Sequence, residues 1–426
     1  MNRSPRSNVR RLAFGRLIAR TGAAATYTAL NFIVWERTGS PVMQAMSLLL
    51  TFGVTGLVGP LAGAIGDRFD RRRVMIWSEA VAAAFLTAMV FASSPVVLIG
   101  LAFGSAVAEM PFFTASRAAI PPLVESEDDL SWANSLVTMG VHAGIALGPV
   151  LGGLLVSWLA PGSDPTARDL HVAGAVVFGL NALTFVVSLL VTLSVRGRFQ
   201  EERTERDVAE HGGLMAGIGF MARDPVLRRM AIAWVVFVLG MGVGMVADAP
   251  LADSFGAGGL GFGLLIACWG TGSVLGTAAG RWMNARTEPM FIVVGAAGVA
   301  LSAAGVGLFG LFPLVLVSLF VMGTCDGLSI VAENGVVQRR TPDAVRSRTM
   351  AALEAALSIG LALSYVAAGP ILRVVAPQTA YLIGGVFALG ATFVLLPLLR
   401  LRTDGGRTQE PIEAPSEPTV AERLTV

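Results

Sequence analysis

The chain has 426 residues, of which 54% are hydrophobic and a further 50 are glycine. Roughly two thirds of the chain is thus apolar, against about half in soluble domains, and charged residues make up only 14% against a usual value of about 25%. This composition excludes a water-soluble fold and indicates an integral membrane protein surrounded by a lipid bilayer. The net charge is only +2 and the basic residues are spread over many loops, so no nucleic acid is expected as a partner.

Residues that could hold a metal or a cofactor are few and scattered. Cys268 and Cys325 lie in separate apolar runs without a C-x-x-C pattern, and His142, His171 and His211 are far apart in sequence. A P-loop for ATP needs a glycine-rich stretch followed by lysine, and the chain contains no lysine. We therefore expect no metal, no cofactor, no catalytic residues and no enzyme, and pumping driven directly by ATP within this chain is excluded.

Twelve apolar runs divide the sequence. A helix needs about 20 apolar residues to cross a bilayer, and irregular backbone cannot face lipid, so each run is predicted to form one transmembrane helix. The fold class is therefore all-α integral membrane, with twelve transmembrane helices. The runs cover residues 12–35, 42–64, 74–93, 96–118, 132–158, 172–194, 229–251, 260–283, 290–311, 313–336, 349–372 and 379–400.

The two halves of the chain resemble each other. Residues 117–121, before the fifth run, are similar to residues 339–342, before the eleventh. A duplicated six-helix unit is the simplest explanation, and such a parallel repeat places a substrate path between the halves. Within the linker, residues 212–221 are compatible with an amphipathic helix on the inner leaflet or with a solvated tether. We expect an N-terminal six-helix half, a cytoplasmic linker, a C-terminal six-helix half and a disordered cytoplasmic tail, over residues 1–194, 195–228, 229–402 and 403–426.

Arginine residues orient the predicted helices, because short cytoplasmic loops of membrane proteins carry the positive excess. Four arginines precede the first run, four follow the second and four follow the tenth. Three of the loops on the opposite side hold single arginines, Arg37, Arg168 and Arg373. The sequence therefore predicts a multi-pass protein of the cell inner (cytoplasmic) membrane, with both termini in the cytoplasm.

The loop after the second run carries a specific motif, Gly63-Ala-Ile-Gly66-Asp67-Arg68-Phe69-Asp70-Arg71-Arg72-Arg73. It resembles the G-x-x-x-D-R-x-G-R-R-R signature of the major facilitator superfamily, and its D-R-F-D-R-R-R form is similar to the branch that contains macrolide efflux proteins and the enterobactin exporter. Asp70 stands where many members carry glycine. We expect Gly63, Asp67, Arg68 and Arg71 to form a conformational latch, with Asp67 at a helix N-terminus. The alternative is that the arginines only fix the orientation.

The fifth run contains a second motif, Gly144-Ile-Ala-Leu-Gly148-Pro149-Val-Leu-Gly152-Gly153. It resembles the G-x-x-x-G-P-x-x-G-G pattern that recurs in proton-coupled antiporters of the same superfamily, so the resemblance implies export. Small residues at every fourth position allow close helix packing, and Pro149 bends the helix. Such a surface can pack tightly in one state and separate in another. A tight helix pair without any role in export also explains the glycines.

Ionisable residues inside the predicted helices are candidates for proton coupling, because a charge within a membrane is expensive and usually faces a cavity or a partner. Asp326 and Glu333 are seven residues apart and share a helix face. A carboxylate in an apolar cavity takes up a proton more readily near neutral pH than one in water. For each candidate, a static ion pair is the alternative role. In order of preference the candidates are Asp326, Glu109 and Glu333, followed by Glu354, His142 and Arg20.

We interpret the chain as a secondary active efflux transporter that works as a monomer by alternating access. The favoured mechanism is proton-coupled antiport of a hydrophobic or amphiphilic small molecule, such as a drug, a secondary metabolite or a siderophore, which connects the protein with antibiotic resistance. Two alternatives remain. One is a nutrient uptake symporter that uses Asp326 and Glu333 together, and the other is a transport-inactive membrane sensor. Many related exporters have an acidic residue after the glycine of helix one, whereas this chain reads Arg20-Thr21-Gly22-Ala23. If that acid carries the proton in relatives, the role has moved here or coupling is absent.

Overall fold

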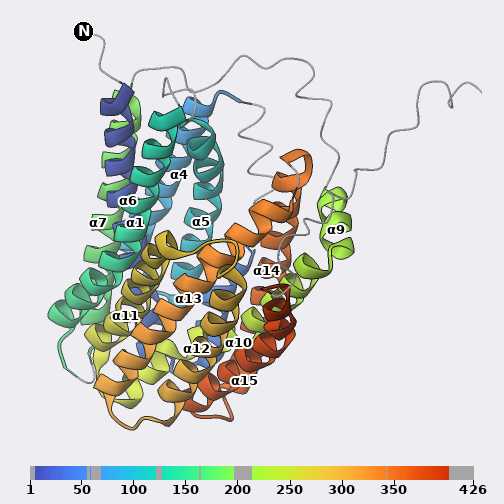
Figure 1. Ribbon diagram of the computed structural model, residues 1–426. Helices are drawn as coiled ribbons and strands as arrows, with labels where there is room; N and C mark the ends of the chain where they lie inside the picture. The colour runs from blue at the N-terminus through green and yellow to red at the C-terminus, as the bar shows by residue number, and fades with distance from the viewer. Residues whose placement is uncertain are drawn as a thin grey trace, which may run out of the picture.

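The computed structural model describes residues 5–54, 58, 69–120, 127–162, 165–195, 214–341 and 343–402, and every regular element in these ranges is a helix (Figure 1). The N-terminal part contains α1 (Pro5–Thr38), α2 (Pro41–Leu48), the π-helical turn η1 (Leu49–Val54), α4 (Arg71–Phe91), α5 (Pro95–Ala118), α6 (Glu127–Leu159) and α7 (Ala167–Ser194). The C-terminal part contains α9 (Leu214–Arg223), α10 (Pro225–Ser254), α11 (Gly258–Ala278), η3 (Ala279–Trp282), α12 (Glu288–Leu308), α13 (Phe312–Arg340), α14 (Asp343–Ile371), α15 (Pro377–Leu395) and η4 (Leu396–Arg402).

Ten of the described helices, α4 to α7 and α10 to α15, are long and apolar enough to cross a membrane. They correspond to the third to twelfth predicted runs. The first run lies within α1, which is less apolar than these ten. The second run begins with the shorter apolar helix Pro41–Gly53, and most of its remainder lies outside the described residues. The fold is thus all-helical and multi-pass.

The lower hydropathy of α1 comes from its six arginines and from several uncharged polar residues, and some of the latter have partners inside the bundle. The Asn31 side chain donates to the Tyr27 carbonyl at 2.9 Å and accepts from the Gln44 side chain at 3.2 Å. The Asn181 side chain on α7 donates to the Thr26 hydroxyl at 2.8 Å. A buried polar group costs little once it is hydrogen-bonded, so these residues are compatible with a position inside the bundle.

The helices pack in two groups, which we call the N-terminal group (α1 to α7) and the C-terminal group (α10 to α15). In the N-terminal group, α1 packs against α6 and α7, while α4 packs against α5 and α7. In the C-terminal group, α10 packs against α14 and α15, α11 against α13, and α12 against α13 and α15. Figure 1 shows the long helices of the two groups side by side, and α6 of one group packs against α11 of the other.

Polar caps begin several of the long helices. The Asp70 side chain accepts the Arg73 backbone N–H at 2.8 Å and so caps α4. Asp is among the preferred N-cap residues. This explains how the loop motif can carry Asp70 at the position where glycine is usual. Asp224 caps α10 in the same way and also accepts from Arg340 Nε at 3.1 Å. That ion pair joins the start of α10 to the end of α13.

Of the two alternatives for residues 212–221, a helix is present: α9 runs from Leu214 to Arg223. It packs along α14, and Phe220 and Met221 contact the apolar core of the C-terminal group. Residues 196–213 of the linker and the tail from 403 onward lie outside the described residues.

Contacts between the two groups gather at one end of the bundle, which we call the loop end because residues 38–41 and 254–258 lie there. Trp35 Nε1 donates to Asp253 Oδ2 at 3.2 Å, and the backbone N–H of Leu260 donates to the Ser157 hydroxyl at 2.7 Å. A Cβ atom built on Gly369 of α14 would lie 3.2 Å from the Cα atom of Val42 on α2. The groups are therefore held together at the loop end.

Candidate functional site

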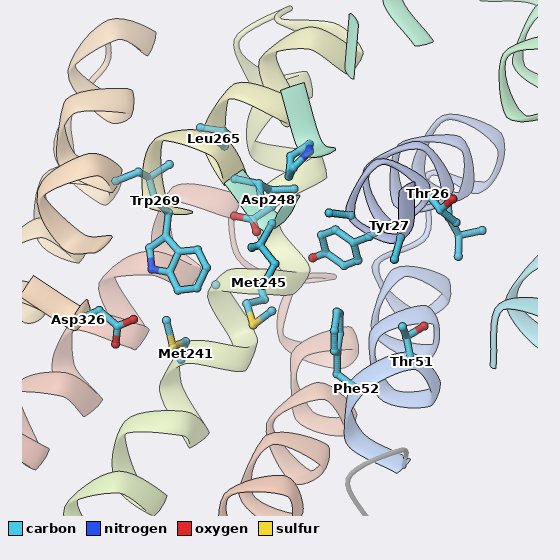
Figure 2. A pocket seen from close by; sticks show the side chains of 18 of the residues that line it. Thr26, Tyr27, Thr51, Phe52, Met241, Met245, Asp248, Leu265, Trp269 and Asp326 are labelled. Carbon is cyan, nitrogen blue, oxygen red and sulfur yellow. The ribbon is translucent and has the colours of Figure 1, made fainter. Parts of the chain in front are cut away.

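A cavity of about 730 Å³ lies between the two groups. Its wall is mostly apolar and is supplied mainly by α1, α5, α10 and α13, with smaller parts from α11 and α15. Figure 2 shows Trp269, Met241 and Met245 on one side of the cavity and Tyr27 and Phe52 opposite them. A concave, largely apolar site with a few polar groups is the usual form of a small-molecule site. It can bind an organic molecule with a large apolar surface.

Arg20 and Glu109 meet on the N-terminal side of the cavity. Arg20 Nη2 lies 3.9 Å from Glu109 Oε2, and the guanidinium carbon lies 3.8 Å from the centre of the Phe113 ring. Both contacts favour a buried cation, one by charge and the other by the electron density of the ring face. A Cβ atom on Gly144 would lie 2.7 Å from the Cβ atom of Arg20, so the absence of a side chain at Gly144 lets α6 approach the backbone of α1 at this point.

Asp326 lines the cavity from α13 and is only 9% exposed. In the part of the chain that the structure describes, its carboxylate has no hydrogen-bond or ion-pair partner. Glu333, two turns further along α13, is 8% exposed and lies outside the cavity wall. Of the two carboxylates expected on one helix face, one therefore reaches the cavity and the other is packed away from it.

Asp248 lines the cavity but is not among the residues predicted from the sequence. It lines the wall from α10, and the Tyr381 hydroxyl of α15 donates to its Oδ1 atom. It lies three residues before the predicted end of the seventh run. A charged side chain so close to the end of a transmembrane helix is expected to reach the membrane surface, so the sequence did not mark it as buried. The sequence does contain one indication of its burial. Apolar residues lie on both sides of Asp248, and the helix continues beyond it to Ser254.

The glycines of α6 face two different neighbours. Cβ atoms built on Gly144, Gly148 and Gly152 would lie 2.5 to 2.9 Å from the carbonyl oxygens of three residues one turn apart on α1, namely Leu17, Thr21 and Ala25. No real Cβ atom fits at such distances, so only glycine permits this packing.

The next glycine belongs to the contact between the groups. A Cβ atom on Gly153 would lie 2.6 Å from the Gly259 carbonyl oxygen, and one on Gly263 would lie 2.5 Å from the Pro149 carbonyl oxygen. The motif thus contacts α1 on one side and, across the boundary between the groups, α11 on the other.

The remaining predicted site residues lie elsewhere. Gly63, Asp67 and Arg68 are outside the described residues, and Arg71 is the first residue of α4. Glu354 is exposed on α14 and is not part of the cavity wall. His142 lies on α6, but its side chain is outside the description.

The sequence matches the family model of the Major Facilitator Superfamily over residues 12–312 and 241–424. The chain belongs to the major facilitator superfamily. The resemblance seen in the loop motif is thereby confirmed, and the protein is a multi-pass membrane transporter of small molecules.

Curated relatives of this superfamily member include exporters. The multidrug efflux pump Tap of Mycolicibacterium fortuitum is 26% identical over 426 residues, which cover 94% of this chain and 98% of Tap. The enterobactin exporter EntS of Shigella boydii serotype 18 is 26% identical over 327 residues, which cover 73% of this chain and 72% of EntS. Both belong to the branch that the motif resembles.

The fold is also found in solved structures. One is a transporter of the POT family in complex with a thioalcohol-conjugated peptide. It superposes with a TM-score of 0.71 at 12% identity and covers 93% of this chain and 96% of its own. This likeness concerns the fold alone.

We predict that the Gly148→Leu variant of this transporter is inserted in the membrane but loses at least about nine tenths of its transport. A leucine side chain at this position collides with the Thr21 carbonyl, and such overpacking typically costs about 1–3 kcal/mol. Dye efflux from cells without their own pumps, divided by the amount of protein in the membrane, measures the effect.

Gly100→Leu is the matched control for this substitution. Gly100 lies in α5, it is exposed, and a Cβ atom there meets nothing within 4 Å. We expect this variant to transport normally. Full activity of Gly148→Leu would show that α6 does not depend on close contact with α1.

Proposed function

We propose that this protein is a secondary active efflux transporter, which exports a hydrophobic or amphiphilic small molecule in exchange for protons by alternating access. The observation that supports the proposal is the apolar cavity between the two groups of helices. Carboxylates line this cavity, and the two groups are in contact at the loop end. A carrier of this kind binds its substrate midway between two bundles and exposes it to each side in turn.

The proposed architecture has twelve transmembrane helices in two six-helix halves. The ten apolar helices supply ten of them, and α1 and the helix that begins at Pro41 supply the first two. We place the halves at 1–194 and 229–402, the linker at 195–228 and the tail at 403–426. The arginine distribution places the termini in the cytoplasm and the protein in the inner membrane. In that orientation the loop end faces outward, and the structure is closed toward the outside.

Export is favoured over uptake by two observations of different kinds. The names of Tap and EntS describe efflux and export, and the α6 motif resembles that of antiporters. In an uptake symporter Asp326 and Glu333 would act together on one ligand, but only Asp326 reaches the cavity. A transport-inactive sensor is the remaining alternative, and substrate flux in reconstituted vesicles distinguishes it from a carrier.

We propose Asp326 as the main proton carrier, with Glu109 second and Glu333 third. Asp326 combines deep burial, contact with the cavity and the absence of a hydrogen-bond or ion-pair partner among the described residues. Glu109 also lines the cavity, but Arg20 lies 3.9 Å away and stabilises its ionised form. Glu354, His142 and Arg20 remain weaker candidates.

The loop motif is proposed to latch one conformation through Gly63, Asp67, Arg68 and Arg71. The negative charge of Asp67 would be stabilised at a helix N-terminus of the other half. We predict that Asp67→Asn, which keeps the size of the side chain, loses most of its transport while its amount in the membrane stays normal. The same dye efflux assay measures this, and normal efflux by the variant would contradict the latch.

The main experiment measures uphill transport by Asp326→Asn in proteoliposomes with an imposed pH difference. Asparagine mimics a permanently protonated carboxyl group, so we expect accumulation driven by the pH difference to vanish, while exchange of labelled for unlabelled substrate continues. Asp326→Glu is the matched control because it keeps a carboxylate at the site, and it should retain part of the uphill transport.

Two outcomes contradict the assignment of Asp326 as the main proton carrier, and a third contradicts the transport function. Uphill transport that persists in Asp326→Asn rules out Asp326 as the indispensable proton carrier, and Glu109→Gln and Glu333→Gln then test the other two carboxylates in the same way. A protein that fails to accumulate in the membrane points to a structural role of the carboxylate in place of proton transfer. Absence of any flux in the unmodified protein contradicts the transport function itself.

A further inference from the structure

All three tyrosines of the chain gather around one carboxylate, that of Asp248. The Tyr381 hydroxyl donates to Asp248 Oδ1, and Tyr27 and Tyr365 both lie near enough to interact with its charge. In Figure 2 the ring and the hydroxyl of Tyr27 point across the cavity toward Asp248. In a sequence with so few tyrosines, this convergence on one acidic residue calls for a chemical explanation.

The four residues come from both groups of helices. Tyr27 lies on α1 of the N-terminal group, while Asp248, Tyr365 and Tyr381 lie on α10, α14 and α15 of the C-terminal group. Tyr27, Asp248 and Tyr381 form part of the cavity wall, and Tyr365 is fully buried behind it. A ligand at Asp248 would therefore touch both groups at once.

The surroundings hold the aromatic rings in place. The Phe52 ring meets Tyr27 edge-on, with centroids 5.4 Å apart and an interplanar angle of 65°. The Tyr365 hydroxyl lies 3.4 Å from the sulfur of Met245, which is itself a cavity residue. Tyr27 and Tyr381 thus direct their hydroxyl groups toward a single carboxylate, and both residues form part of the cavity wall.

The charge balance of the cavity points in the same direction. Among the described residues of the wall there are three carboxylates, Glu109, Asp248 and Asp326, and one guanidinium, that of Arg20. Arg20 lies beside Glu109, so the negative charges of Asp248 and Asp326 have no basic partner in the described wall. Burying an ionised carboxylate is costly unless a cation compensates it.

We propose that Asp248, Tyr27 and Tyr381 form a subsite for the ammonium group of the transported molecule. The ligand class is an amphiphilic organic cation with a tertiary or quaternary amine. Its charge lies against Asp248 and the tyrosine rings, as in aromatic cages for ammonium groups, and its apolar body lies against Trp269, Met241 and Met245. The inference rests on the transport function proposed above and narrows its substrate class.

Two ions of the same shape and opposite charge, tetraphenylphosphonium and tetraphenylborate, test the subsite. Their binding to the purified full-length protein in detergent is measured by isothermal titration calorimetry. We expect the phosphonium ion to bind at least about tenfold more tightly than the borate ion, because the carboxylate attracts one and repels the other. Equal affinity, or tighter binding of the borate ion, would overturn the proposal without the need for any variant.

Variants then locate the subsite. Asp248→Asn should weaken phosphonium binding about tenfold and leave borate binding equal or stronger, which also shows that the variant is folded. Tyr27→Leu should weaken phosphonium binding, whereas Tyr27→Phe, which keeps the ring, should weaken it less. Asp169→Asn is the control, because Asp169 is a half-buried capping residue at the start of α7, outside the cavity. Phosphonium affinity that is unchanged in Asp248→Asn would overturn the assignment.

The binding assay needs no membrane and no gradient, so its failure differs from failure of the transport function. Selective phosphonium binding without flux in vesicles would contradict export and leave the subsite standing. Uphill export of neutral or anionic compounds, combined with equal binding of the two ions, would contradict the subsite and leave export standing.

Discussion

The close approach of α6 to two helices at once is the constraint on which the other features depend. Glycines at every fourth position bring the backbone of α6 against the carbonyl groups of α1, and Gly153 and Pro149 bring it against α11 of the other group. A methyl group at any of these contacts would force the helices apart, so the distance between the groups at the loop end is set by the absence of side chains. The position of Arg20 beside α6 and the closure at the loop end both follow from this spacing.

Two kinds of buried charge share the cavity that this packing leaves. On the N-terminal side, Arg20 and Glu109 lie together and Phe113 covers the guanidinium group, so this pair largely compensates its own charges. On the C-terminal side, Asp326 and Asp248 face a wall without a basic neighbour among the described residues. Protons and organic cations are both chemically suited to compensate such carboxylates, which connects the proposed coupling to the proposed substrate class.

The sequence predicted the helices well because lipid and the bundle core impose the same demand for apolar side chains. It predicted their ends less well, since the backbone continues its hydrogen bonds beyond the hydrocarbon region. The tenth run was expected to end at residue 336, but α13 continues to Arg340, which pairs with the Asp224 cap of α10.

The cavity could be predicted only in part. Asp326, Glu109 and Arg20 stand out as charges inside apolar runs, and the structure places all three at the cavity. The proposed subsite at Asp248 depends on Tyr27 of α1 and Tyr381 of α15, which are distant in sequence from it and from each other, so no spacing within one run could reveal it. The same holds for Gly153, whose neighbours on α11 belong to the other group.

The contact between α6 and α11 closes the cavity at the loop end, and alternating access requires it to open during transport. Disulfide cross-linking of cysteines at Ser157 and Leu260, in a background with Cys268 and Cys325 replaced by alanine, tests this. The two residues adjoin across the contact, since the Ser157 hydroxyl lies 2.7 Å from the Leu260 nitrogen. We predict that oxidation abolishes substrate flux in proteoliposomes, that a reductant restores it, and that either single cysteine is unaffected. Full flux with the disulfide quantitatively formed would contradict the account.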